Sequence, residues 1–252
     1  MGFLNKLGIG LGAAPNRDIA RQVHSNGSNG RAHVPAASVG AIGAPRAPER
    51  SESVRVSNGL KELLWNLDGL GRGTLLDLGP AWQTTLSFFI ERGFRVSSDD
   101  LLRDWKAFLT EEETRLREDS SLRDTLDMTP AGRARRFLEA NLEYPRGSFD
   151  AILLWDLLDY LEPTLGRLLV AQLTELLRSG GVIFAMFHSR KPEAFQRYRV
   201  ADSNTLQVVS APAIFAAQKA YQNREIQDLF ARYRSMRSFV GRDQLRETLF
   251  IK

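Results

Sequence analysis

Hydrophobic residues along this chain gather into four short runs, which are separated by segments with helical spacing. The runs lie within residues 74–80, 94–100, 148–156 and 180–187, and most of them end in a polar or glycine-containing loop. Short apolar runs that alternate with helical patterns are typical of a parallel β-sheet covered by helices. Such sheets bind ligands at the carboxyl ends of their strands. The pattern therefore predicts an α/β fold, with candidate chemistry in the loops that follow the strands.

Leucine and aromatic residues at intervals of three and four positions mark the helices between these runs. We expect helices from Asn58, from about Leu86 to Gly93, over 101–118, over 131–141, from Pro163 to a cap at Gly180–Gly181, and from Asn223.

The last sixty residues carry two further patterns. Residues 195–200 and 205–209 flank the polar segment Ala201–Asn204 and predict a β-hairpin. Residues 235–240 and 245–252 predict a final antiparallel pair of strands, although 243–250 equally fits a helix.

The first part of the chain has a different character. Residues 13–58 are rich in Ala, Gly, Pro, Ser and Asn and contain no Phe, Trp or Tyr. Such a segment buries too little apolar area to offset the entropy of ordering. We therefore predict a disordered N-terminal tail over residues 1–56 and a single α/β domain over residues 57–252.

Charge and composition exclude several classes of function. The formal charge of +4 lies entirely in residues 1–58, so the body of the chain carries no net basic charge for nucleic acid. Cysteine is absent, and no run of eighteen apolar residues occurs. We therefore expect a cytoplasmic protein without disulfides or a membrane span. The three histidines, His24, His33 and His188, form no metal-ligand motif, so no metal is expected.

The order and spacing of the four runs resemble those of class I S-adenosylmethionine-dependent methyltransferases. The quoted residues are Thr74–Pro80, Phe94–Asp100, Ser148–Asp156 and Gly180–Phe187. The resemblance implies a doubly wound, mostly parallel, seven-stranded Rossmann-like sheet with the hairpin as an insertion. It also implies S-adenosyl-L-methionine as the cofactor and an acceptor that the sequence does not identify.

The same resemblance assigns cofactor-binding residues to the first turn. Asp77 and Gly79 match the acidic residue and glycine that end the first strand, and Pro80 and Ala81 continue the turn. Ala81 and Gln83 stand where further glycines are usual, so this turn departs from the family pattern. Between them lies Trp82, and we expect its side chain to point away from the cofactor.

Later loops supply the other candidates. Asp100 matches the carboxylate that accepts from both ribose hydroxyls, with Asp99 as a rival, and helix capping is an alternative for either. The remaining cofactor candidates are Leu101 and Asn141, both near the adenine, and Trp155, just past the carboxyl end of the strand in the third run.

The sequence offers two candidate catalytic residues, on weaker grounds than the cofactor-binding residues. His188 follows the last run, where a general base can stand, and Asp156 is the second candidate. The leading hypothesis is S-adenosylmethionine-dependent methyl transfer. Two alternatives remain open: a degenerate relative that acts by binding or interaction without catalysis, and a nicotinamide dehydrogenase. The dehydrogenase lacks its G-x-G-x-x-G turn here.

Overall fold

The computed structural model describes residues 52–252, which lie within one compact unit of the chain. The tail predicted over residues 1–51 lies outside the described residues. Residues 52–56, which the same prediction assigns to the tail, form strand β1 instead and pair with strand β7. The ordered part of the chain therefore begins before the predicted boundary at residue 57.

The elements follow the predicted alternation of strands and helices. The strands are β1 Glu52–Val56, β2 Gly73–Asp77, β3 Phe94–Ser98, β4 Phe149–Trp155, β5 Leu177–His188, β6 Gln196–Asp202, β7 Thr205–Ser210, β8 Ser235–Val240 and β9 Leu245–Ile251. The helices are α1 Asn58–Leu67, α2 Gln83–Ile90, α3 Leu101–Glu118, α4 Leu122–Thr125, α5 Pro130–Asn141, α6 Leu157–Tyr160, α7 Pro163–Leu176 and α8 Asn223–Leu229.

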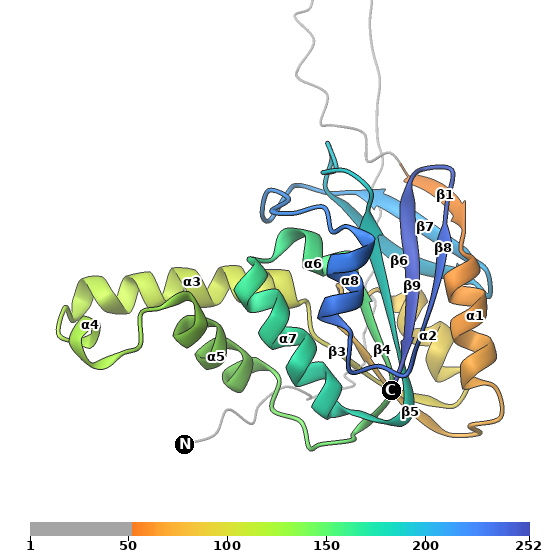
Figure 1. The fold of residues 1–252 in the computed structure, drawn as a ribbon, viewed down its shortest axis with the longest axis horizontal. Coiled ribbons are helices and arrows are strands. Elements are labelled where there is room, and N and C mark those ends of the chain that lie inside the picture. The colour runs from red at the N-terminus through yellow and green to blue at the C-terminus, as the bar shows by residue number, and fades with distance from the viewer. Residues whose placement is uncertain (1–51) are drawn as a thin grey trace, which may run out of the picture. The chain divides into compact units, whose positions relative to one another are not determined.

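The main sheet has the strand order β3-β2-β4-β5-β9-β8 (Figure 1). Its first four strands are parallel, β9 runs antiparallel to β5, and β8 runs antiparallel to β9. The described sheet thus has six strands, not the predicted seven. Between β3 and β4 the chain forms only helices α3, α4 and α5, whose charged amphipathic sequence offers no apolar run for another strand.

A second, smaller sheet has the order β1-β7-β6, and all its pairings are antiparallel. Strands β6 and β7 form a hairpin over the residues where the sequence predicts one. Val56, at the end of β1, faces Thr205, at the start of β7. The backbone N–H of Ser57 then donates to the carbonyl of Asn204, which ties the start of α1 to the turn of the hairpin.

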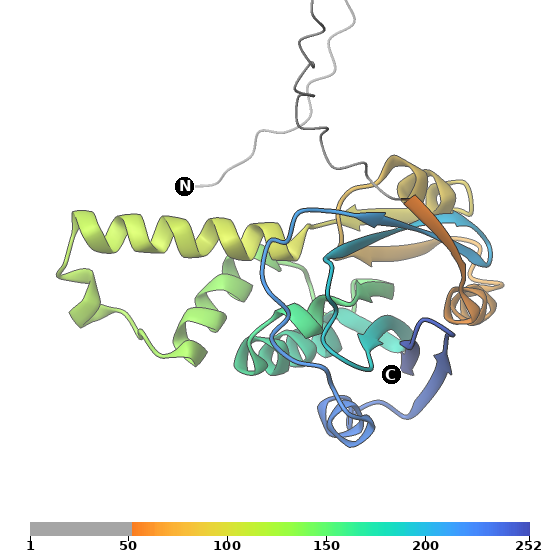
Figure 2. The same cartoon turned by 90° about the horizontal axis from the view of Figure 1, so that it is seen from above.

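Helices cover both faces of the main sheet (Figure 2). Alternate strand residues point to opposite faces, as the pleat requires. Leu75 packs into one hydrophobic cluster with α1 and α2, whereas its neighbour Leu76 packs into another with α5, α7 and α8. The two clusters bury the apolar faces that the helical spacing predicts.

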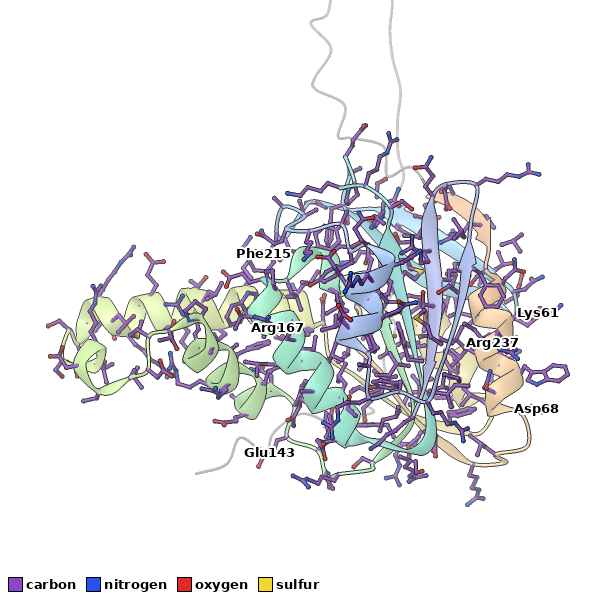
Figure 3. All side chains as sticks on the ribbon, viewed as in Figure 1. Lys61, Asp68, Glu143, Arg167, Phe215 and Arg237 are labelled. Carbon is purple, nitrogen blue, oxygen red and sulfur yellow. The ribbon has the colours of Figure 1, made fainter. Side chains whose placement is uncertain are left out.

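Local signals explain most helix ends. Ser57 caps α1 by accepting from the backbone N–H of Leu60 at 2.9 Å, and Thr129 caps α5 ahead of Pro130. At the edge of the sheet, Arg237 of β8 lies beside α1 and pairs with Glu62 (Figure 3).

The junction of α7 and β5 differs from the expectation of a helix capped by Gly180–Gly181. Helix α7 ends at Leu176, and β5 begins at the next residue. The register between β4 and β5 shifts between Phe149 and Ala151, and Gly180 has a φ of +79°. The two glycines therefore belong to an irregularity within a strand, where a residue with positive φ is tolerated.

Among residues 52–252, no helix is both long enough and apolar enough to cross a membrane.

Candidate functional site

The site lies at the carboxyl ends of the parallel strands, where the strand order reverses. The chain passes from β2 to β3 on one side, and then to β4 and β5 on the other. In open α/β sheets this switch point is where ligands bind. Asp77 ends β2, and Trp155 ends β4 directly beside it.

Asp77 is buried and only partly satisfied. Its Oδ1 accepts from Nε1 of Trp155 at 2.6 Å and from the backbone N–H of Gly79 at 2.9 Å. Within the described residues its Oδ2 has no hydrogen-bond partner. Burial raises the pKa of Asp77 from its ordinary 3.8 to about 6, although the two hydrogen bonds act in the opposite direction. An unpartnered buried oxygen of this kind is typical of a functional site.

Trp155 occupies the space above the glycine turn. A Cβ placed on Gly79 would lie 2.7 Å from Nε1 of Trp155, so the indole packs directly on the backbone there. Trp155 also has a φ of +52°, which is uncommon for a large aromatic residue. Its ring stacks on Tyr198 of β6, with centroids 6.1 Å apart. The sequence assigns Trp155 to cofactor binding. In this structure its side chain instead fills the space over the backbone of Gly79, which we call the cradle.

Asp100, the ribose candidate, makes an ion pair. Its Oδ1 and Oδ2 accept from Nη2 of Arg197, in β6, at 2.9 and 3.3 Å. Asp100 stands at the N-cap position of α3, but its side chain makes no capping hydrogen bond. The rival Asp99 accepts from the hydroxyl of Tyr144 at 2.8 Å.

The other residues of the first turn lie around this centre. Gly79 is buried, Pro80 is half-buried and Ala81 is exposed. Trp82 precedes α2, and the guanidinium of Arg199, in β6, lies 5.3 Å from the centre of its ring. The ring of Trp82 therefore contacts the hairpin, and the residue over Gly79 is Trp155.

Two further candidates have structural surroundings. Leu101 is fully buried in the core, and its backbone N–H donates to the carbonyl of Leu78. Asn141 donates to the carbonyl of Phe137 at 2.8 Å, within its own helix α5. It also lines a cavity of about 510 Å³ beside α3, which Asp77 and Asp100 do not line.

His188 ends β5 and forms a dyad with Asp159 of α6. Asp159 Oδ2 accepts from the backbone N–H of His188 at 2.8 Å and lies 2.9 Å from its Nδ1. A proton on Nδ1 satisfies this contact and leaves Nε2 free to accept another. Burial lowers the pKa of His188, but the bond to Asp159 and the charges of Asp156, Asp159 and Asp243 raise it, and the net shift is upward.

Asp156 lies between the two groups of residues. It is buried, and burial raises its pKa to about 7, while His188 acts in the opposite direction. Its Oδ2 is 3.9 Å from Nδ1 of His188 and accepts from the hydroxyl of Tyr198 at 3.4 Å. A carboxyl group that titrates near neutral pH is suited to proton transfer.

His188 opens onto a cavity of about 290 Å³ at the carboxyl end of β5. The segment after β5 and the turn between β8 and β9 form its walls, including Arg190, Lys191, Gln196 and Asp243. The side chain of His188 is 14% exposed. His188 therefore ends a strand and lines a cavity, and it is not a solvated loop residue.

Three residues that shape the site had no cofactor-binding or catalytic role assigned to them from the sequence: Asp159, Arg197 and Tyr198. Asp159 carried a signal, because it lies in the loop after the third apolar run. Arg197 and Tyr198 belong to the hairpin, and their spacing in the sequence gives no sign of where the hairpin folds. Within residues 52–252, no group of three or more His, Asp or Glu side chains is arranged to hold a metal ion.

Comparisons with known proteins give structural likenesses only. No protein-family model matches the chain, and no curated protein matches it. One solved structure that matches is 1,6-didemethyltoxoflavin-N1-methyltransferase of Burkholderia thailandensis, with 1,6-didemethyltoxoflavin and S-adenosylhomocysteine bound. The identity is 15%, the match covers 78% of this chain and 79% of that one, and the TM-score is 0.39.

Two more matches are also methyltransferases. The glycopeptide N-methyltransferase MtfA, complexed with S-adenosyl-L-methionine, is 16% identical over 77% of this chain and 94% of its own, with a TM-score of 0.39. A Thermotoga maritima S-adenosylmethionine-dependent methyltransferase, possibly for histamine, is 11% identical over 77% and 88%, with a TM-score of 0.37. What each of these proteins binds is a property of that protein, so a function for this chain has to come from its own residues.

Proposed function

We propose that this chain binds S-adenosyl-L-methionine at the switch point of its sheet and transfers the methyl group to a small acceptor beside His188. One observation carries the proposal. Buried Asp77 with its glycine turn and the carboxylate of Asp100 stand at the ends of neighbouring strands β2 and β3. A glycine turn beside a carboxylate at this edge suits a nucleoside cofactor, because the backbone approaches closely and the carboxylate accepts from a diol.

The chemistry of these residues fits the cofactor, although the space is taken in the closed structure. Asp100 has two oxygens for a ribose diol, and Asp77 has an unpartnered oxygen at the cradle. Binding requires that the indole of Trp155 leaves Gly79 and that Arg197 leaves Asp100. The strained φ of Trp155 favours such a change, because strain is stored at sites that move.

On the acceptor side, the dyad of His188 and Asp159 is suited to remove a proton. Asp159 holds the imidazole in place through two contacts with His188, and the cavity gives an acceptor access to the ring. When bound, the cofactor supplies a methyl group already activated by its sulfonium. The chain then has to orient the acceptor, take its proton at Nε2 of His188 and exclude water.

The experiment is calorimetric titration with S-adenosylhomocysteine, with NAD as the competing cofactor class. We expect S-adenosylhomocysteine to bind and NAD not to bind. Asp100→Ala should weaken the binding by about 1–3 kcal/mol, the scale of a hydrogen bond to a charged group. Asp99→Ala is the matched control and should leave the affinity unchanged. Loss with Asp99→Ala alone would move the role to that residue, and a wild type that binds NAD in preference would overturn the proposal.

A second candidate is a degenerate methyltransferase-like protein that takes up no cofactor and acts by interaction with a partner. The observation that favours it is the closed cradle, where Trp155 covers Gly79 and Arg197 neutralises Asp100. Titration of a Trp155→Gly variant separates the two functions. Binding by the wild type supports the enzyme, whereas binding only after removal of the indole supports a site that no longer takes up cofactor.

Two coarser expectations complete the proposal. Because the sequence has no cysteine, we place the protein in a reducing compartment, the cytoplasm. We also propose that residues 1–51 are a tail that the α/β domain does not need for folding. Cell fractionation tests the first expectation and a deletion tests the second.

A further inference from the structure

Arg197 is a buried cation whose only ion pair among the described residues is with a residue needed for ligand binding. It is 7% exposed, and its Nη2 donates to both oxygens of Asp100. The ring of Phe195 lies 4.9 Å from the guanidinium carbon and covers one face of the group. Arg197 is thus held by one carboxylate and one aromatic ring, with little access to water.

The proposed binding mode breaks this ion pair. For Asp100 to accept from a ribose diol, its oxygens must lose most of their contact with Arg197. A buried guanidinium left without an anion is strongly unfavourable, so Arg197 needs a new partner. Arg197 lowers the pKa of both Asp156 and Asp77, but burial raises these pKa values more strongly, so a negative charge on either buried carboxyl is disfavoured relative to one in water.

We propose that Arg197 exchanges Asp100 for a carboxylate carried by the ligand itself, so the site selects nucleosides that bear both a ribose diol and a carboxylate. The exchange rests on the proposed cofactor site. The exchange leaves neither charged side chain without a partner. Asp100 loses a guanidinium and gains two hydroxyl donors, and Arg197 loses one carboxylate and gains another. Arg197 is then a specificity-determining residue that touches the ligand.

One alternative partner lies within the protein. Oδ2 of Asp77 has no hydrogen-bond partner among the described residues, and it would become accessible once Trp155 moved. If Arg197 turned to Asp77, the ligand's carboxylate would be unnecessary. The two possibilities predict different behaviour for ligands with and without a carboxylate.

The test compares two ligands on three proteins. S-adenosylhomocysteine carries the diol and the carboxylate, whereas 5′-methylthioadenosine carries the diol and a thioether but no carboxylate. Each is titrated by calorimetry into the wild type, Arg197→Met and the control Arg199→Met. Arg199 lies two positions along β6, and it contacts Glu52, Gln207 and the ring of Trp82, away from Asp100.

We expect Arg197→Met to weaken the binding of S-adenosylhomocysteine but not that of 5′-methylthioadenosine. The wild type should prefer S-adenosylhomocysteine by roughly ten- to a hundred-fold, the range of a charge-assisted contact. Arg197→Met should remove that preference by weakening S-adenosylhomocysteine. Binding of 5′-methylthioadenosine should stay equal or strengthen, because Asp100 no longer has to leave an ion pair. Arg199→Met should match the wild type for both ligands.

Two results would overturn the exchange while leaving the cofactor site in place. Equal weakening of both ligands by Arg197→Met would mean that Arg197 only holds Asp100 or the hairpin. A preference for S-adenosylhomocysteine that survives in Arg197→Met would mean that Arg197 does not meet the carboxylate. A wild type that binds neither ligand would instead remove the proposed function and the exchange with it.

A variant that keeps the charge protects the test against misfolding. If Arg197→Met loses its thermal transition, Arg197→Lys replaces it. Lysine keeps the cation but loses the planar fork, so the preference should shrink without disappearing. An unchanged preference, or equal loss for both ligands, would again count against the exchange.

Discussion

The carboxyl edge of the sheet is closed at one end and open at the other. We call Asp77, Gly79, Asp100, Trp155 and Arg197 the closed edge, because an indole and a guanidinium fill it. The open edge consists of His188, which lines the 290 Å³ cavity, and the buried carboxyls of Asp156 and Asp159 beside it. The hairpin that supplies Arg197 to the closed edge contacts Asp156 through Tyr198 but leaves the cavity at His188 open. A ligand at the closed edge must therefore replace contacts that the protein already makes, whereas the open edge needs only to admit one.

The largest effect is expected from removing the indole of Trp155, which fills the closed edge. Trp155→Ala should destabilise the fold by about 3–5 kcal/mol, the usual cost of truncating a buried Trp. Trp155→Gly should be about 1 kcal/mol more stable than Trp155→Ala, because glycine tolerates a φ of +52°. Urea unfolding measures both.

The same variants should open the cradle. Trp155→Gly should bind S-adenosylhomocysteine more tightly than the wild type, because no ring has to leave Gly79. Trp82→Gly is the matched control, since the ring of Trp82 contacts Arg199 of the hairpin, and little gain is expected. Similar gains in both variants would show that closure is a property of the whole hairpin and not of Trp155.

The charge of Asp77 should make the closed edge sensitive to pH. Its pKa is about 6 in the folded chain and 3.8 when unperturbed, so between these values the folded chain binds more protons than the unfolded one. Stability should therefore fall as pH rises from about 4 to 6, by roughly 3 kcal/mol in all. Asp77→Asn cannot ionise, so the stability difference between wild type and variant should show this slope. A difference that stays flat across the window would place the titration elsewhere.

At the open edge the corresponding pH dependence has the same sign. The pKa of His188 is raised, so its protonation stabilises the fold at low pH, and this contribution disappears as pH rises through that raised pKa. Asp159→Asn should lower the pKa of His188, because it removes the negative charge beside Nδ1 and leaves at most a neutral hydrogen-bond acceptor. NMR titration of the imidazole measures it, with Asp243→Asn as a control that should produce a smaller decrease. Equal shifts in the two variants would contradict the dyad.

The smallest effect is expected from deleting residues 1–51, which should leave the thermal transition unchanged. Deleting residues 1–56 should lower the melting temperature, because it also removes β1 and the ion pair between Arg55 and Glu247. The pair of deletions shows how far the small sheet above the closed edge depends on its first strand. A large loss of stability on deleting residues 1–51 would contradict the proposed domain boundary.

Local patterns in the sequence predict the elements well. The four apolar runs become β2 to β5, and the helix predicted over 101–118 is α3, from Leu101 to Glu118. These elements depend on spacing within a few residues, which a sequence displays directly. The seventh strand implied by the resemblance is absent from the described main sheet, because the residues between β3 and β4 contain no apolar run.

The arrangement of the site could be predicted only in part. Asp77 and Asp100 could be named as candidates because each lies at the end of its own apolar run. Their contacts could not be predicted, because Trp155, itself a candidate, lies 78 positions from Asp77 and Arg197 lies 97 positions from Asp100. No local periodicity encodes such pairings. His188 was identified by its place at the end of a strand, but its dyad partner Asp159 required the fold.

During synthesis, strand β1 cannot pair until most of the chain has been translated. Its partner β7 is translated about 150 residues later, since Glu52 pairs with Val209. Asp77, Asp100 and Trp155 therefore leave the ribosome before the strands that cover them. A small molecule present during synthesis meets the growing sheet before β6 and β7 close over it.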